Sequence, residues 1–370
     1  MRIVLAAGYA PSLIGFRGPL LEAIVKAGHE VWAMAPEDDP EVAAALKKMN
    51  VGYRQTLFQR TSMNPMADVR GMNHLAEALR DLKPDLILSY PLRMAIWANL
   101  AAVKAGVPGR YVMVTGMGTA FTAPGIKGKA MAAFARSLMK RSFRGAARVI
   151  VQNPDDAREI AEMGVVSQEK LAVVNGSGVD LSLYPLQDWP TGPVKVLMIG
   201  RLLKEKGVRE YAEAAAIVRA SRPDVEFHLL GMKEEGHTSA ISDSEVDLWQ
   251  KDNRLIWHGQ QAVLPYLKEA SLYVLPSYRE GTPRSVLEAL AAGRPVVTTD
   301  VPGCRETIED GVEGRLVPAK DGQALAQAIL EILESPERLR QMGAAARARA
   351  EAKYDVHLVN QQMLALMGLG

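Results

Sequence analysis

Short apolar runs alternate with longer amphipathic stretches along the whole chain, and this alternation constrains the fold more than any other feature. In the first half the apolar runs are residues 3–6, 31–34, 86–88, 111–114 and 149–151. Segments with helical periodicity separate them, for example residues 17–27 and 66–82. Strands this short and apolar are typically buried on both faces, so they predict a parallel sheet covered by helices on each side.

The same pattern restarts after a segment rich in glycine and proline, residues 176–193, which is typical of a linker. The second set of apolar runs comprises residues 194–199, 226–230, 255–257, 272–275 and 295–298. The sequence therefore predicts an α/β chain with two doubly wound domains, residues 1–175 and 190–350, facing a cleft. Ligands of such sheets bind at the carboxyl ends of the strands.

Composition narrows the class of protein without identifying it. The chain has 370 residues, of which 48% are hydrophobic, and a formal net charge of +2. This charge gives no electrostatic reason to expect a nucleic-acid partner. The one cysteine, Cys304, cannot form an internal disulfide, which favours a reducing compartment and hence the cytoplasm. No apolar run reaches the ~20 residues that a membrane-spanning helix needs.

A glycine-flanked pair of cations follows the first strand of the second domain. Arg201 comes directly after Gly200, and Lys206 precedes Gly207. Glycines allow a backbone to approach an anion, while Arg and Lys supply a donor fork and a point charge for phosphate oxygens. The alternative is a pair of solvated charges at a turn. The position after a buried strand favours the phosphate interpretation.

A second motif follows the strand at residues 272–275 and carries two glutamates eight positions apart, Glu280 and Glu288. Pro283 suits the first turn of a helix, whose N–H groups would face a phosphate. Glu288 would lie deeper in that helix, where a carboxylate accepts hydrogen bonds from ribose hydroxyls. An ordinary surface glutamate is the alternative, but its neighbours are apolar on every side, and a buried charge needs a partner. The remaining residues of this motif that we expect at the ligand are Gly281, Thr282, Arg284 and Ser285.

These residues resemble the retaining nucleotide-sugar glycosyltransferases of the GT-B fold, in glycosyltransferase family four. Glu280 and Glu288 match the family's pair of glutamates, Arg201 and Lys206 match its diphosphate-binding Arg and Lys, and residues 293–297 and 303–306 match further parts of its second domain. The resemblance implies an N-terminal acceptor-binding domain, a C-terminal nucleotide-sugar-binding domain and a last helix, within residues 351–370, that returns to the N-terminal domain. It also implies that Glu280, Arg201 and Lys206 are catalytic.

Three further segments, residues 12–18, 115–118 and 152–155, are similar to a narrower branch. That branch builds bacterial glycans on a polyprenyl diphosphate carrier and includes N-acetylgalactosaminyltransferases of protein N-glycosylation. The resemblance implies transfer of a hexose or N-acetylhexosamine from a UDP-sugar to a lipid-linked acceptor. Gly15 and Arg17 would lie at the donor, although residues 12–18 could equally form a simple tight turn. Thr115 and Gly116 would lie on the acceptor side.

The chain departs from the family at one position. Many members carry a histidine after the strand that ends here at Val114, where this chain has Thr115 and Gly116. No catalytic histidine can therefore be carried over, and front-face attack assisted by the leaving phosphate requires none. We expect neither a cofactor nor a metal, because cations and helix N–H groups already balance the diphosphate. A nucleotide-sugar epimerase of the same fold and a non-catalytic nucleotide-sugar-binding protein are the alternatives.

The segment 126–149 is strongly basic and contains no acidic residue. Between its cations lie apolar residues such as Phe134, so a helix here would be both basic and apolar. Such a helix is typical of contact with an anionic membrane surface. A domain helix with a solvated basic side is the alternative. The membrane interpretation predicts a peripheral protein on the cytoplasmic face, and its cations are Lys127, Lys129, Arg136, Lys140, Arg141, Arg144 and Arg148.

Overall fold

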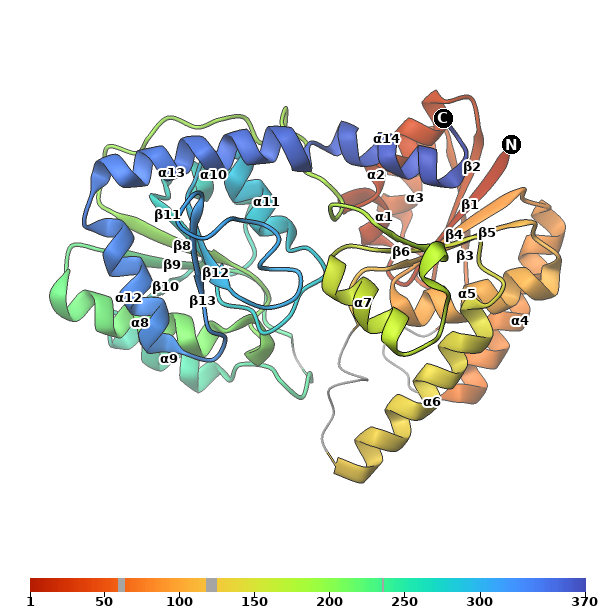
Figure 1. Cartoon of the computed structure of the whole chain (residues 1–370), viewed down its shortest axis with the longest axis horizontal. Coiled ribbons are helices and arrows are strands. Elements are labelled where there is room, and N and C mark those ends of the chain that lie inside the picture. Colours follow the sequence, from red (N-terminus) through yellow and green to blue (C-terminus); the bar gives the residue numbers. More distant parts are fainter. Residues whose placement is uncertain (59–63, 118–124, 235) are drawn as a thin grey trace. The chain divides into compact units, whose positions relative to one another are not determined.

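The computed structural model describes residues 1–58, 64–117, 125–234 and 236–370, without the side chains of residues 65 and 125–130. The chain forms two compact units (Figure 1). The first comprises Met1–Ser177 together with His357–Gly370, and the second comprises Gly178–Val356. The chain therefore leaves the first unit within the segment rich in glycine and proline and re-enters it at its C-terminal end.

The first unit is built on a parallel sheet with seven strands in the described part of the chain. Their order is β3-β2-β1-β4-β5-β6-β7. The central strand β1 pairs with β2 on one side and β4 on the other, so that Leu5 lies opposite both Ala33 and Leu88. The strands are β1 (Arg2–Ala7), β2 (Glu30–Ala35), β3 (Val51–Gln55), β4 (Leu86–Tyr90), β5 (Gly109–Val114), β6 (Arg148–Val151) and β7 (Leu171–Val173).

Helices cover both faces of this sheet (Figure 1). Several begin with proline after an Asn or Asp that accepts hydrogen bonds from the first free N–H groups, as Asp39, Asn64 and Asn153 do. The helices are α1 (Pro11–Gly15), α2 (Gly18–Lys26), α3 (Pro40–Lys48), α4 (Pro65–Leu82), α5 (Leu92–Ala105), α6 (Gly125–Phe143), α7 (Pro154–Glu162), the 3₁₀ turn η2 (Gln168–Lys170) and α14 (Val356–Met367). Among the described residues, none of the helices combines the length and hydropathy required to cross a bilayer.

The C-terminal helix α14 completes the hydrophobic core on one face of the first sheet. Met363, Met367 and Leu369 are buried there with Leu5 and other side chains of the sheet. The Tyr111 hydroxyl also donates a hydrogen bond to the Met367 carbonyl at 3.3 Å. Each fully buried apolar side chain of this size contributes about 1.5–3 kcal/mol, so these contacts bind the last helix firmly to the first unit.

The second unit repeats the architecture with six parallel strands among its described residues, in the order β10-β9-β8-β11-β12-β13. These strands are β8 (Lys195–Ile199), β9 (Glu226–Leu230), β10 (Ile256–Trp257), β11 (Leu272–Leu275), β12 (Val296–Thr299) and β13 (Gly314–Val317). The helical elements are the 3₁₀ turn η3 (Lys204–Lys206), α8 (Val208–Ser221), α9 (Asp243–Lys251), α10 (Val263–Glu269), α11 (Arg284–Ala291), α12 (Gly322–Leu333), α13 (Pro336–Arg349) and the π-turn η4 (Ala350–Tyr354). The two doubly wound sheets confirm the predicted fold class.

Each sheet has a point at which the strand order reverses. In the first unit it lies between β1 and β4, and in the second between β8 and β11. The connections from these two neighbouring strands run to opposite sides, so the carboxyl edge at this point is where ligands of doubly wound sheets bind. In the second unit, Gly200 and Arg201 follow β8, and Glu280 lies in the segment that follows β11. Both predicted motifs therefore lie at the reversal point.

Candidate functional site

The segment after β8 holds Arg201 at the carboxyl edge of the second sheet. The Gly200 N–H donates to the Leu230 carbonyl at 2.9 Å, which fixes the segment against β9. A Cβ on Gly231, whose φ is +152°, would lie 1.8 Å from the Gly200 carbonyl oxygen, so this approach requires glycine. Arg201 pairs with Glu234 at 3.0 Å while its side chain stays 48% exposed. The guanidinium thus keeps donors available for an anion.

Lys206 and Glu280 meet directly, although they are distant in sequence. Lys206 Nζ lies 2.5 Å from Glu280 Oε1, and the Ser277 hydroxyl donates to the same oxygen at 2.7 Å. The Lys206 and Glu280 side chains are only 20% and 13% exposed. Gly207, which follows η3, has a φ of +74°, and a Cβ there would lie 2.1 Å from the Pro276 carbonyl oxygen. Packing within the protein therefore requires this glycine.

The backbone around Glu280 is held on its far side as well. The Glu280 N–H donates to the Pro302 carbonyl at 3.0 Å. Gly303 has a φ of +82°, and a Cβ on it would lie 2.2 Å from the Glu280 carbonyl oxygen. Burial and the nearby Glu280 charge raise the pKa of the Cys304 thiol to about 12. The thiol is therefore inert at neutral pH, and Glu280 sits in a rigid loop beside a cation.

The N-terminus of α11 lies next to this loop. The sequence suggested that Pro283 lies in the first turn of this helix. The structure instead has Pro283 as the N-cap residue, with an extended ψ of 111°, so it precedes the helix. A proline has no side-chain acceptor, so the N-cap residue itself does not cap this helix. Gly281 and Thr282 form the loop before it. The first N–H groups of the helix, at Arg284 and Ser285, are therefore placed to receive an anion.

A buried tyrosine connects this helix to β8. The Tyr273 hydroxyl donates to the Ser285 Oγ at 2.7 Å and lies 3.2 Å from the Ile199 carbonyl oxygen. Burial raises the Tyr273 pKa well above its usual value, so the hydroxyl keeps its proton. These contacts fix the position of the end of β8, and hence of Gly200, relative to the first turn of α11.

Glu288 is a buried carboxylate in the second turn of α11, with 7% of its surface exposed. Its Oε1 lies 3.0 Å from Arg284 Nε, one helical turn earlier. The Tyr184 hydroxyl also donates a hydrogen bond to the carboxylate. Burial raises the pKa of Glu288 above its ordinary value, and Arg284 only partly offsets this. A surface glutamate is thus excluded at this position.

Sequence reasoning missed the residues that support these charges. Tyr184 lies in the segment rich in glycine and proline, which looked like a linker, and Ser277 and Tyr273 looked like ordinary residues of a strand and its loop. The one available signal was the buried carboxylate itself, because such a group requires donors from somewhere in the chain. Nothing in the spacing indicated where those donors would be.

In the first unit, residues 12–18 comprise most of α1, a two-residue turn and the first residue of α2. Arg17 is 3% exposed, and its guanidinium carbon lies 5.1 Å from the centre of the Tyr90 ring. Burial raises the pKa of Tyr90 to about 12. Because Arg17 follows β1 and Tyr90 ends β4, the pair lies at the reversal point of this sheet. A Cβ on Gly15 would meet nothing within 4 Å, so packing does not require glycine there.

The predicted acceptor-side residues belong to the same unit. Thr115 and Gly116 directly follow β5 and are half-buried. Most of the basic segment forms α6, on which Lys140 and Arg141 are exposed, and Arg144 is exposed in the turn that follows it. Arg136 donates from Nε to the Met163 carbonyl at 2.7 Å. Lys127 and Lys129 lie on α6, but their side chains are outside the described residues.

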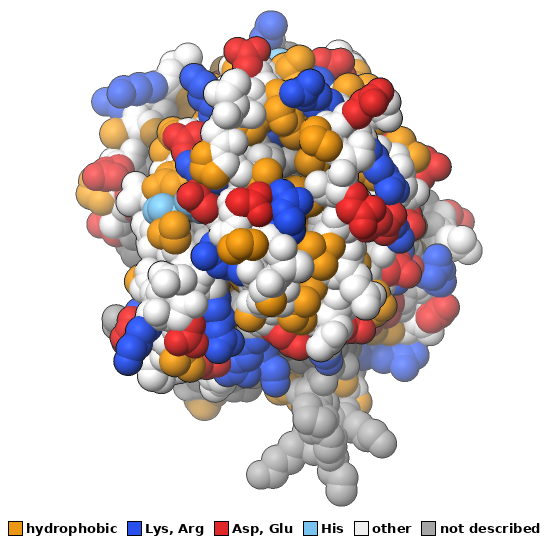
Figure 2. All heavy atoms as spheres, turned by 90° about the vertical axis from the view of Figure 1, so that its left-hand side faces the viewer, with side chains coloured by type: hydrophobic (Ala, Val, Ile, Leu, Met, Phe, Trp, Pro, Cys, Tyr) orange, Lys and Arg blue, Asp and Glu red, His pale blue; other side chains and the backbone are white. Residues whose placement is uncertain are grey.

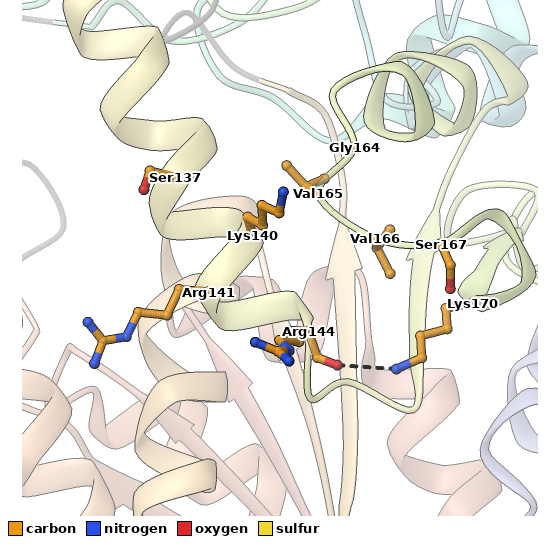
Figure 3. A pocket seen from close by; sticks show the side chains of 9 residues that line it. All are labelled: Ser137, Lys140, Arg141, Arg144, Gly164, Val165, Val166, Ser167 and Lys170. Carbon is orange, nitrogen blue, oxygen red and sulfur yellow. Dashed lines mark hydrogen bonds between the residues drawn. The ribbon is translucent and has the colours of Figure 1, made fainter.

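The surface shown in Figure 2 is not uniformly basic, in contrast to the C-terminal end of α6, around which the charged side chains drawn in Figure 3 are all cations. Figure 2 looks onto the face that forms the left-hand side of Figure 1, and there acidic and basic side chains are intermixed. Over the described ranges, no group of three His, Cys, Asp or Glu side chains is arranged to hold a metal ion. The cations on this edge include Arg201, after β8, and Lys206 in η3.

Comparison with known proteins gives two family matches. Residues 18–176 match the glycosyl transferase 4-like domain, and residues 186–349 match the family described as glycosyl transferases group 1. Together these matches account for most of the chain and divide it close to the boundary between the two units.

One relative matches this chain over nearly its full length. The chain is 29% identical to an N,N'-diacetylbacillosaminyl-diphospho-undecaprenol alpha-1,3-N-acetylgalactosaminyltransferase of Campylobacter jejuni, covering 99% of this chain and 98% of the relative. It is 30% identical to the amylovoran biosynthesis glycosyltransferase AmsK of Erwinia amylovora, over 49% of this chain and 46% of that protein. Among solved structures, Anabaena HepE in complex with UDP and glucose superposes with a TM-score of 0.80 at 19% identity, covering 100% and 99% of the two chains. Sucrose-phosphate synthase from Thermosynechococcus elongatus also superposes with a TM-score of 0.80 at 19% identity, over 99% and 98%.

Proposed function

Because the chain belongs to the glycosyltransferases that join a glycosyl transferase 4-like domain to a group 1 domain in a GT-B fold, we propose that it transfers an N-acetylhexosamine from a UDP-sugar to a sugar carried on a polyprenyl diphosphate. The named activity of the Campylobacter relative supports this choice, since the similarity spans nearly all of both chains. The epimerase and the non-catalytic binder have no comparable support.

One observation carries the proposal: groups that suit the diphosphate, the ribose and the donor sugar of a UDP-sugar lie together at the reversal point of the second sheet. Arg201, Lys206 and the N-terminus of α11 would bind the diphosphate. Glu288, held by Arg284 and Tyr184, would accept hydrogen bonds from the ribose hydroxyls. Glu280 would contact the donor sugar at its reacting end.

The proposed chemistry follows from these roles. A hydroxyl oxygen of the acceptor forms a bond to the anomeric carbon as the bond from that carbon to the UDP oxygen breaks. The hydroxyl proton passes to the departing diphosphate on the same face of the sugar, so the anomeric configuration is retained and UDP leaves. Arg201 and Lys206 stabilise the negative charge that develops on UDP, which is the role a divalent ion takes in other enzymes. We propose that transfer proceeds without a metal.

We also propose that the protein works at the cytoplasmic surface of a membrane, where such an acceptor is embedded. The exposed cations of α6 support this, because an anionic leaflet attracts each nearby Lys or Arg by about 1 kcal/mol. Liposome flotation tests the association. Recovery that is equal on neutral and anionic vesicles would contradict it.

The decisive test of the function is mass spectrometry of products from a panel of UDP-sugars with a polyprenyl-diphosphate-linked acceptor. We expect one UDP-N-acetylhexosamine to extend the acceptor by a single sugar, with retained configuration by NMR. A changed UDP-sugar without any acceptor product would instead indicate an epimerase. No consumption of any nucleotide sugar by a folded protein that still binds UDP would indicate a non-catalytic binder.

A further inference from the structure

A tyrosine ties the loop that carries Glu280 to the start of α8. Tyr278 lies two residues before Glu280. Its backbone N–H donates to the Glu205 carbonyl at 2.9 Å, and its hydroxyl donates to Glu210 Oε1 at 2.7 Å. Glu205 belongs to η3, and Glu210 belongs to the first turn of α8. The loop is therefore fastened to this segment by its main chain and by a side chain.

The same two segments hold the charged pair of the candidate site. Lys206 follows Glu205 in η3, and its Nζ lies 2.5 Å from Glu280 Oε1. Ser277 precedes Tyr278, and its hydroxyl donates to the same carboxylate oxygen at 2.7 Å. Tyr278 thus fixes the backbone from which both Ser277 and Glu280 extend. Its bonds set the position of the Glu280 carboxylate relative to the Lys206 ammonium.

Of these two segments, the start of α8 is the rigid one. Val208 and Tyr211 in its first turn are fully buried in the core of the second unit. The turn before it is closed by a hydrogen bond from the Gly207 N–H to the Lys204 carbonyl at 3.0 Å. Tyr278, in contrast, is half-buried and lies in a loop without regular secondary structure. If the hydroxyl of Tyr278 were removed, the loop would move and Lys206 would stay.

Glu210 is an unfavourable partner for stability. One of its oxygens accepts the Tyr278 hydrogen bond, whereas Oε2 is buried and has no hydrogen-bond partner among the described residues. A buried charged oxygen without a donor carries an uncompensated desolvation cost, which two apolar side chains of similar shape would avoid. Burial and the bond to Glu210 raise the pKa of Tyr278, so its hydroxyl keeps the proton that it donates. The pair supplies a directional bond at the expense of stability.

We propose that Tyr278 is a positioning residue, whose hydroxyl bond to Glu210 sets where the Glu280 carboxylate lies relative to Lys206 and to the reacting end of the donor sugar. The inference rests on the proposed function for the role of Glu280. It deepens that function, because it adds a residue that controls turnover without touching the substrate. A directional bond is useful there, since a displacement of about 1 Å at a reacting group can lower a rate by roughly 100-fold.

Tyr278→Phe removes the hydroxyl and keeps the ring, whose centre lies 5.1 Å from Lys320 Nζ. The kcat for consumption of the UDP-sugar should fall by roughly 10- to 100-fold. The Kd for UDP, measured by calorimetry, should change by less than about three-fold, because Lys206 and the start of α11 stay in place. Glu210→Gln keeps an acceptor oxygen for the hydroxyl and should retain kcat to within roughly three-fold. A wild-type kcat in the folded Tyr278→Phe variant would overturn the proposal.

A double variant separates positioning from stability. Tyr278→Phe combined with Glu210→Leu removes both polar partners, including the buried Oε2, so it should unfold at a temperature no lower than the wild type. Its kcat should remain as low as that of Tyr278→Phe, and it supplies the kinetic test if the single variant does not fold. Recovery of kcat together with stability would show a merely structural contact and overturn the proposal.

The matched control is Arg209→Ala. Arg209 precedes Glu210 on α8, and its Nε pairs with Glu245 at 2.7 Å instead of contacting the Glu280 loop. This variant should leave both kcat and the Kd for UDP unchanged. A loss of kcat as large as that of Tyr278→Phe would show that any change at the start of α8 slows turnover, and it would overturn the specific role of Tyr278.

A measurement without turnover keeps this outcome separable from that of the proposed function. The coupling between Lys206→Met and Glu280→Gln is measured by a double-mutant cycle in urea unfolding, in the wild type and in the Tyr278→Phe, Glu210→Leu background. The coupling should be present in the wild type and lost in that background. Loss of coupling without turnover of any UDP-sugar refutes the transferase proposal and leaves the positioning role standing. Turnover with a coupling that persists in that background does the reverse.

Discussion

Replacing Glu288 with Gln should weaken UDP binding while leaving the unliganded fold intact. The substitution keeps the size of the side chain and one acceptor oxygen, but it removes the charge that Arg284 and Tyr184 hold in place. Because burial raises the pKa of Glu288, the ionised carboxylate is costly in the unliganded protein. The variant should therefore unfold at a temperature no lower than the wild type near neutral pH.

The expected loss of affinity follows from the hydrogen bonds that change. A hydrogen bond to a charged group contributes about 1.5–3 kcal/mol and a neutral one about 0.5–1.5 kcal/mol, so each ribose hydroxyl loses roughly 1–1.5 kcal/mol. Two hydroxyls give about 2–3 kcal/mol, which is a rise in Kd of roughly 30- to 150-fold. Tyr184→Phe keeps the carboxylate and removes one donor to it, so it should cost less, roughly 3- to 10-fold.

Isothermal titration calorimetry with UDP and with its 2′,3′-dideoxy analogue measures these changes. The Glu288→Gln penalty should be large for UDP and nearly absent for the analogue, which has no ribose hydroxyls to lose. An equal penalty for both ligands would refute the ribose assignment, and so would wild-type affinity for UDP in the variant.

The pH dependence supplies an independent check on the same carboxylate. Its folded pKa is raised, so it takes up a proton at a higher pH than an ordinary glutamate does. UDP affinity of the wild type should fall as the pH falls through that raised pKa, whereas the Gln variant should show no such step. For unfolding the sign is opposite, because a carboxyl group with a raised folded pKa makes its full contribution to stability below its unfolded pKa. Part of it is lost as the pH rises through the folded pKa.

The remaining predictions concern catalysis and the C-terminal helix. Arg201→Ala should lower kcat/KM by about 10²-fold or more. Arg209 is a similarly exposed arginine of the same unit, and Arg209→Ala should leave kcat/KM unchanged. Unchanged kinetics in the folded Arg201 variant would remove Arg201 from the site. Glu280→Gln should reduce kcat more than it reduces UDP affinity, and the reverse order in steady-state and binding data would move Glu280 to the nucleotide. Transfer should persist in excess chelator, and abolition with rescue by magnesium or manganese would contradict metal independence. Met363→Ala should destabilise the first unit by about 2–5 kcal/mol in calorimetry, whereas Leu358→Ala, 45% exposed on the same helix, should have little effect.

The fold could be predicted from the sequence wherever a strand is apolar enough to be recognised by itself. The central strands are of this kind, and the predicted 226–230 and 272–275 coincide with β9 and β11. The missed strands β3, β7 and β13 are short, partly exposed segments that contain polar or small residues. Their pairing with a neighbouring strand defines them, and this pairing is invisible to local periodicity.

The candidate site shows the same limit in its side chains. The charged groups stand out in the sequence. Arg201, Lys206 and Glu280 adjoin glycines after apolar runs, and Glu288 is surrounded by apolar residues. Their partners do not stand out, since Lys206 reaches Glu280 across 74 positions. Parallel strands with helical crossovers bring such residues together at one edge, and the reversal of strand order decides which pair of strand ends receives them. The chain therefore encodes the charges of its site locally, whereas the neutral donors that hold them, such as Tyr184 and Ser277, are specified only by the completed fold.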